Sequence, residues 1–128
     1  MISRQTWVSV SDNTTVKWLQ VFHLYKGFIR KSSPVGFFLK GSARVVSPPR
    51  IEYKGFKLKY NTKGDICRGL IIRGTFHSKR LDGAVVFFPV NNIVLIKKQQ
   101  NIKSKYVLGP VEKTLKRKKF KTFFKSTV

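Results

Sequence analysis

The sequence predicts a mainly β protein, built as a small closed or nearly closed β-barrel with a short helical segment near the C-terminus. Most apolar segments are short, rich in Val, Ile, Phe and Trp, and bounded by turn residues. Helix-type signals appear only near the end of the chain. The length of 128 residues, 41% of them apolar, favours one domain, with the barrel over about 1–98 and a basic C-terminal loop and helix over about 99–128.

The first half of the chain predicts three strands. Thr6 to Ser11 alternates between two faces, and Asp12-Asn13 then marks a turn. Val16 to Tyr25 is typical of the returning strand. A third apolar stretch, Phe37 to Val46, is interrupted at Gly41, which indicates one bent strand with a bulge.

The second half predicts a fourth strand followed by a meander. Ile66 to Thr75 is an apolar run with two embedded arginines, which favours a strand. Asp82-Gly83 supplies a hairpin signal, because this pair readily adopts the positive φ of a tight turn. Ala84 to Phe88 and then Ile93 to Ile96 continue the strand pattern.

Helix chemistry appears after the last predicted strand. Pro110 stands at a suitable first helical position, and Glu112 places an acid in the first turn. The residues that follow, Lys113 to Lys119, predict a short helix of about two turns.

The charge balance requires a polyanionic partner. The chain has 27 Lys plus Arg against 5 Asp plus Glu, a formal net charge of +22. Because so cationic a compact chain repels itself, it needs phosphates to neutralise it, and RNA, DNA and an anionic membrane surface are the candidates. The longest apolar runs are too short for a membrane-spanning helix. Cys67 is the only cysteine, which excludes an intrachain disulfide and fits a reducing compartment.

A pattern of fixed positions in the later strands points to one family. Its parts, in order, are Gly69-Leu70-Ile71-Ile72, nine residues, Asp82-Gly83, four residues, Phe88, two residues, Asn91, two residues, and Val94-Leu95. Three further stretches agree in order and spacing: Gln5-Thr6 with Asp12-Asn13, Lys63-Gly64-Asp65, and Gly109-Pro110-Val111 with Leu115 and Lys119-Phe120. From Met1 almost to the C-terminus, the chain resembles the universal large-subunit ribosomal protein fourteen family.

This resemblance implies a five-stranded β-barrel with a small helical C-terminal part, bound to large-subunit rRNA on the face that meets the small subunit. It also implies contacts with neighbouring ribosomal proteins and, in an intersubunit bridge, with small-subunit rRNA across the interface. The chain departs from the family at Thr14-Thr15-Val16, where Ser-Gly-Ala is usual, at Phe37, where an acid is common, and in its basic, Phe-rich C-terminus. These departures affect contacts of the loops rather than the fold.

The C-terminal residues form the largest basic cluster. Residues 113–125 hold seven lysines and arginines and no acid, interleaved with Phe120, Phe123 and Phe124. The charges predict phosphate contacts, which give affinity without sequence preference. The phenylalanines either stack on unpaired bases or close the bottom of the barrel, and the sequence leaves both interpretations open.

Other basic residues lie in loops and along the predicted strands. Lys40 and Arg44, four apart, share one face, whereas Arg68 and Arg73, five apart, point to opposite faces unless a bulge intervenes. For the pairs at 79–80 and 97–98, simple solvation is almost as well supported as phosphate contact. The predicted RNA-binding residues are Lys26, Arg30, Lys31, Lys40, Arg44, Lys63, Arg68, Lys79, Arg80, Lys97, Lys98, Lys113, Lys116, Arg117, Lys118, Lys119 and Lys121.

The remaining polar residues do not predict an enzyme. Three of the five acids stand beside Asn or Gly in apparent turns, where they cap the backbone, namely Asp12, Asp65 and Asp82. His23 and His77 have no second ligand at metal-binding spacing, and the glycines form no phosphate-binding loop. Cys67, inside a strand, fits a buried thiol better than a nucleophile. The sequence therefore predicts no catalytic, cofactor or metal site.

Two rival functions stay open. A free-standing RNA-binding β-barrel, such as an RNA chaperone or a cold-shock-like module, would act outside the ribosome through aromatic residues on strand faces, and here the aromatics are not concentrated in one short strand motif. A basic peripheral membrane protein would need a longer amphipathic helix than the late segment offers.

Location is predicted from composition. The 19 lysines exceed the 8 arginines and Phe is abundant at 11, which is the bias that an AT-rich genome gives. Together with the high charge and an N-terminus that enters a strand without a leader, this favours a protein made inside a mitochondrion, in the large ribosomal subunit of the matrix. A bacterial cytoplasmic ribosome or a plastid ribosome is the alternative.

Overall fold

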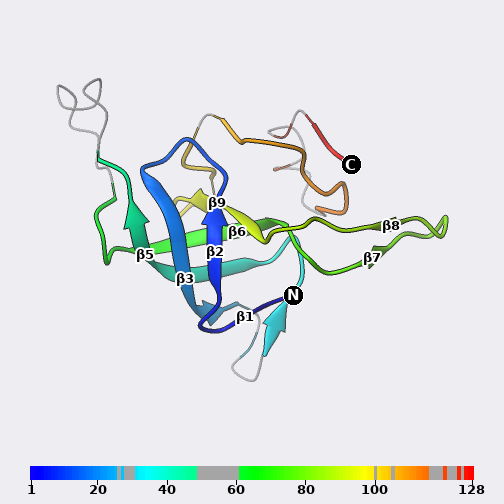
Figure 1. Ribbon diagram of the computed structural model, residues 1–128, viewed down its shortest axis with the longest axis horizontal. Helices are drawn as coiled ribbons and strands as arrows, with labels where there is room; N and C mark the ends of the chain where they lie inside the picture. Colours follow the sequence, from blue (N-terminus) through cyan, green and yellow to red (C-terminus); the bar gives the residue numbers. More distant parts are fainter. Residues whose placement is uncertain are drawn as a thin grey trace.

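The computed structural model describes residues 1–25, 27, 31–48, 61–99, 101–104, 106–115, 120, 124 and 126–128. The described strands follow one another as β1 (Ile2–Ser3), β2 (Trp7–Val10), β3 (Val16–Leu24), β4 (Ser32–Ser33), β5 (Phe38–Val46), β6 (Ile66–Arg73), β7 (Ser78–Lys79), β8 (Val85–Val86) and β9 (Asn92–Ile96). Five of them form the barrel at the centre of Figure 1.

Strands β2, β3, β5, β6 and β9 form a closed barrel in that order. Neighbours from β2 round to β9 are antiparallel, and the barrel closes through a parallel pairing of β2 with β9. In that closing pair Ser9 lies opposite Asn92, and Val10 lies opposite Ile93. Closure leaves no open strand edge in the barrel. The five-stranded barrel that the resemblance implied is confirmed.

The barrel encloses an aliphatic core. Alternate residues of its strands point inward, among them Val8, Leu19, Val21, Leu39 and Ile93, none of which has exposed surface. Burial of each such side chain contributes about 1.5–3 kcal/mol relative to leaving it in water. The strand predictions for these segments are therefore confirmed by both pairing and burial.

Register shifts bend β3 against β5. From Val16 to Trp18, and again from Val21 to His23, β3 advances by two residues while its partner β5 advances by one. Lys17 and Phe22 are therefore extra residues of β3. Gly41 of β5 faces this bent stretch, and an added Cβ there would lie 2.6 Å from the backbone oxygen of Gln20. Strand β5 itself has one extra residue, Arg44, between the pairs Trp18–Val45 and Leu19–Ala43. The bulge predicted for this strand is therefore present, but it lies at Arg44 and not at Gly41.

The predicted hairpin forms, but it lies outside the barrel. Strands β7 and β8 pair only with each other in the described structure and extend away from the barrel in Figure 1. The Arg80 N–H donates to the Ala84 oxygen at 2.8 Å, and Gly83 takes a φ of +86° in the turn between them. The strand expected over Ala84 to Phe88 is wrong in extent, because only the two residues of β8 find a partner strand.

The C-terminal segment covers the outer side of β6 and β9. It joins the outward apolar residues of those strands in a second buried cluster, which comprises Leu70, Ile72, Val94, Ile96, Val111, Leu115, Phe120 and Phe124. Phe120 and Phe124 are 3% and 6% exposed. Both rings therefore pack against the barrel wall instead of presenting themselves to unpaired bases, whereas Phe123 lies outside the described residues.

The helix expected over Lys113 to Lys119 is mostly outside the described residues. Lys113 and Thr114 form a turn, and the Leu115 N–H donates to the Glu112 oxygen at 3.4 Å. Backbone bonds fix this turn to the chain end, since the Lys113 N–H donates to the oxygen of Val128 at 2.9 Å.

A buried arginine joins the barrel to the C-terminal segment. Arg73 is 8% exposed, and its Nη1 donates to the oxygens of Leu108 at 2.7 Å and Pro110 at 3.0 Å. Its Nε donates to Asn92 Oδ1 at 3.0 Å, and its Nη2 donates to the hydroxyl of Ser11. Burial lowers the pKa of Arg73 from its ordinary value, yet a guanidinium stays charged in proteins. Arg68, by contrast, is half-buried and lines a surface groove. The prediction of opposite faces assumed a regular strand, and a register shift between Ile71 and Arg73 breaks that regularity.

Replacing this arginine tests its structural role. Arg73→Met keeps the apolar stem but leaves two backbone oxygens without their donor, so we expect the free energy of unfolding to fall by about 1–3 kcal/mol. Urea unfolding followed by circular dichroism measures the change. Arg44→Met, at an exposed arginine, is the control and should shift stability by no more than about 0.5 kcal/mol. Equal losses in the two variants would contradict the role assigned to Arg73.

Candidate nucleic-acid interface

The structure places ten of the predicted RNA-binding residues. Seven are exposed, namely Lys31, Arg44, Lys63, Lys79, Lys97, Lys98 and Lys113. Three are half-buried, namely Lys40, Arg68 and Arg80. The other predicted residues lie outside the described part of the chain, and these are Lys26, Arg30, Lys116, Arg117, Lys118, Lys119 and Lys121.

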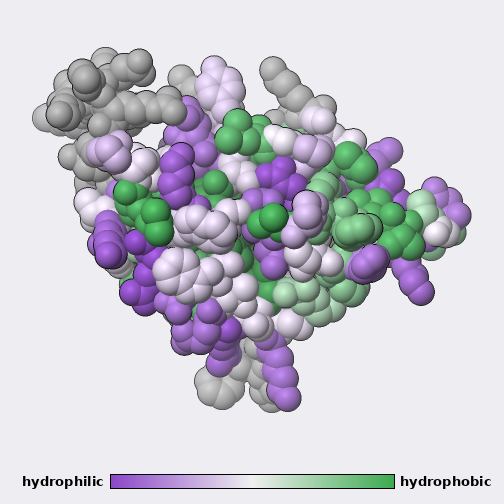
Figure 2. Space-filling model, viewed as in Figure 1, coloured by the Kyte–Doolittle hydropathy of each residue, from purple (hydrophilic) through white to green (hydrophobic). Residues whose placement is uncertain are grey.

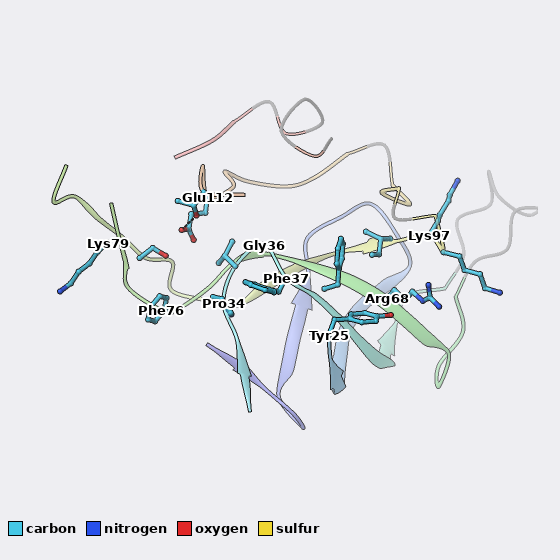
Figure 3. Close-up of a pocket in the computed structure, with 15 residues that line it drawn as sticks. Tyr25, Pro34, Gly36, Phe37, Arg68, Phe76, Lys79, Lys97 and Glu112 are labelled. Atoms are coloured by element: carbon cyan, nitrogen blue, oxygen red, sulfur yellow. Dashed lines mark hydrogen bonds between the residues drawn. The ribbon is translucent and has the colours of Figure 1, made fainter. Parts of the chain in front are cut away.

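Strand pairing brings three of the placed cations to one end of a groove. Arg68 of β6 pairs with Ile96, the last residue of β9, so that Lys97 and Lys98 follow directly beside it. All three cations line the same groove, and Figure 3 shows Arg68 and Lys97 at one end of it. Lys40 lies opposite Arg68 on β5, with its Nζ 5.7 Å from the centre of the Tyr25 ring.

The groove has a volume of about 790 Å³ and runs from this cationic end to the base of the hairpin. Phe76 and Lys79 lie at the hairpin end in Figure 3, and Phe37 lies between the two ends. Glu112 also lines the groove, but it is 2% exposed. The arrangement can hold phosphates at its ends and apolar or aromatic groups between them.

The sequence analysis missed the aromatic lining of this groove. Tyr25, Phe37 and Phe76 come from three separate segments, and only the fold brings them to one cavity. The replacement of a common acid by Phe37 was the one available signal, because it removes a negative charge from this wall.

Lys40 and Arg44 share the outer face of β5, as their spacing predicted. Arg44 Nε donates to Gln20 Oε1 at 2.8 Å, and Gln20 Nε2 donates to Gln5 Oε1 at 3.0 Å. This short chain of side chains runs across the outside of the barrel and holds the Arg44 guanidinium over β3, at the surface.

The acids that the sequence placed in turns bind backbone groups. Asp12, 3% exposed, accepts from the Leu95 N–H at 2.8 Å and from the Thr14 N–H at 3.1 Å. Asp65 accepts from the Thr62 N–H at 2.8 Å, and Asp82 accepts from the Ala84 N–H at 3.0 Å. These carboxylates serve the fold, and of the three only Asp12 is buried, whereas Asp65 and Asp82 are exposed.

Within the described ranges, no group of three or more His, Cys, Asp or Glu side chains could hold a metal ion. In the same part of the chain, no helix has the length and apolar character needed to cross a membrane.

Comparison with known proteins identifies the family. The family model for ribosomal protein L14p/L23e matches residues 1–127. The chain belongs to the L14p/L23e family. It is also similar to the large ribosomal subunit protein uL14m of Tetrahymena pyriformis, with 34% identity over 124 residues that cover 97% of each chain. The resemblance predicted from the spacing of the later strands is thereby confirmed.

The residues that resemble the L14p/L23e family serve mainly to build the barrel. An added Cβ at Gly69 would lie 3.0 Å from Cδ1 of Ile93, so a larger residue would crowd the core. Gly109 has a φ of +81°, and an added Cβ there would collide with the Arg73 guanidinium. Asn91 accepts from the Thr75 N–H at 3.0 Å at the end of β6. The cations that line the groove lie outside these fixed positions.

The single thiol is buried and provides a chemical test of this packing. Cys67 is 6% exposed, and its Sγ lies 3.7 Å from the Asp65 oxygen. Desolvation by burial raises the pKa of Cys67 from its ordinary value of 9.0 to about 11, although nearby Lys103 opposes the rise and Asp65 and Asp12 add to it.

We expect alkylation of Cys67 by iodoacetamide at pH 8 to be slow in the folded chain. The raised pKa alone reduces the reactive thiolate about a hundredfold, and burial slows access further. Because the thiolate forms as pH rises toward the folded pKa, the rate should increase steeply above pH 9. The same chain unfolded in guanidinium is the control. Equal rates in the two states would show that the thiol is not buried.

Proposed function

We propose that the chain is a structural constituent of the large ribosomal subunit, where it binds large-subunit rRNA near the subunit interface and supports an intersubunit bridge. The observation that carries this proposal is the net charge of +22 on a closed barrel. Among the described residues every Lys and Arg except Arg73 has exposed or half-buried surface, whereas Asp12 and Glu112 are buried. Membership of a ribosomal protein family supports rRNA as the polyanion that such a surface binds.

The proposed partners follow from the same surface. Large-subunit rRNA neutralises the groove end formed by Arg68, Lys97 and Lys98, since phosphates are the ligands that clustered Arg and Lys prefer. Neighbouring large-subunit proteins and the small-subunit rRNA across the interface complete the set of contacts. In this role the chain needs no cofactor and performs no catalysis.

We place this function in the mitochondrial matrix, in the large subunit of the mitochondrial ribosome. The similarity to uL14m supports this location, and so does the excess of lysine over arginine in the sequence.

A salt series tests the role of the cationic groove end. We expect the triple variant Arg68→Met, Lys97→Met and Lys98→Met to bind large subunits more weakly, with a logarithmic salt slope shallower by about 2–3, because each lost phosphate contact removes about 0.7–0.9. Co-sedimentation of the full chain with large subunits lacking it measures both quantities. The same assay applies to the triple Ala variant of the tail at Arg117, Lys118 and Lys119.

A charge-conserving variant is the matched control for the groove. Arg68→Lys, Lys97→Arg and Lys98→Arg together keep the same number of cations and should retain the wild-type salt slope. If the Met variant has the affinity and salt slope of the wild type, the groove end does not contact RNA. A wild-type chain that stays RNA-free in the supernatant at low salt would contradict the proposed function as a whole.

A further inference from the structure

The outer face of β2, β3 and β5 carries large rings that nothing in the described structure covers. Trp7 and Trp18 are 49% and 39% exposed, Phe22 is 41% exposed, and Val45 is 45% exposed. We call these four residues the tryptophan face. The C-terminal segment covers the outside of β6 and β9, on another side of the barrel. Figure 2 shows green and near-white side chains between purple ones over β2, β3 and β5.

Strand register brings Trp7, Trp18 and Val45 together on one surface, and Phe22 follows further along β3. Trp7 pairs with Gln20 and Ser9 pairs with Trp18, so the two tryptophans are diagonal neighbours on one face, with Cβ atoms about 7–8 Å apart or less. Trp18 in turn lies opposite Val45 of β5.

The bulges of β3 turn the side chains of Trp18 and Phe22 outward. Lys17 and Trp18 both face outward between the buried residues Val16 and Leu19, and Phe22 and His23 do the same further along the strand. A regular strand would turn one residue of each pair into the core. Bulges commonly re-aim side chains beside functional sites, at the expense of regular pairing.

The charged residues of the strands that carry the rings are all positive. Strands β2, β3 and β5 contain no acidic residue, and their outer side chains include Lys17, Lys40 and Arg44. Lys17 and Arg44 are exposed. Rings beside cations, with no acid among them, complement a polyanion that also offers flat aromatic surfaces.

We propose that the tryptophan face stacks unpaired bases of single-stranded RNA, while Lys17 and Arg44 contact the flanking phosphates. This inference rests on the proposed function and narrows it, because it adds contact with bases to contact with phosphates. Exposed Trp and Arg also occur at protein interfaces, but Lys17 beside the rings favours RNA, because lysine is depleted from the cores of protein interfaces. Base-paired RNA fits less well too, because its bases are already stacked.

Tryptophan fluorescence reads this face alone, because the chain has only two tryptophans and both belong to it. The probes are a short single-stranded RNA oligonucleotide and an RNA duplex with the same number of phosphates, each added to the full chain. We expect the single strand to quench the emission, because a stacked base contacts the indole ring. The duplex should bind through phosphates and leave the emission unchanged.

Substitution provides the affinity test. Trp7→Ala and Trp18→Ala should each weaken binding of the single strand by about 5- to 150-fold, the range for losing one stacked base, and should leave duplex binding unchanged. Trp7→Phe and Trp18→Phe keep a ring and should restore much of the affinity, which separates stacking from any effect on folding. Leu81→Ala, at a fully exposed apolar residue of the hairpin turn, is the matched control and should change neither affinity.

Three outcomes would overturn the inference. They are an emission unchanged by the bound single strand, equal quenching by strand and duplex, and a change in emission only when another ribosomal protein is added. Each leaves the proposed function intact, provided that the chain still enters large subunits in a salt-dependent manner. Failure of the chain to enter large subunits would instead contradict the proposed function. Failure of the inference and failure of the proposed function therefore give different results.

Discussion

The parallel pairing of β2 with β9 is the contact on which the rest of the structure depends. It joins the first barrel strand to the last and so decides which side of each strand faces the core. Asp12 strengthens the same junction, because its carboxylate accepts the Leu95 N–H from β9 immediately after β2 ends. Once the barrel is closed, its inner side is aliphatic, and of the cations in the described ranges only Arg73 is buried.

The outside of the barrel is divided between two tasks. One side, formed by β6 and β9, is apolar and is covered by the C-terminal segment, which Arg73 fixes in place through the oxygens of Leu108 and Pro110. The other side, formed by β2, β3 and β5, remains open and combines rings with cations. The groove lies where the covered side meets the hairpin, with Arg68 at one end. The fold thus uses its apolar residues to hold itself together and leaves most of its described cations on the surface.

Local sequence signals predicted the barrel well because alternation and turn residues act over short distances. The five barrel strands and the Asp82-Gly83 turn were all visible in the sequence. Strand partners were not, so the hairpin was expected to continue the barrel, whereas β7 and β8 pair outside it. Trp7 stood on the opposite phase from Val8 and Val10 in the alternating segment, which agrees with its exposure. Trp18 carried no such signal, since its outward turn depends on a register shift against β5. The groove could not be predicted either, because it joins segments far apart in the chain.

The central claim is that this cationic barrel is held in the large ribosomal subunit by rRNA. A density map of the mitochondrial ribosome from the source organism tests it most directly. The account predicts density for the barrel in the large subunit, with rRNA phosphates against the outer cations and the hairpin free of the barrel wall. Large subunits that lack the chain, while the chain itself is recovered free of RNA, would contradict it.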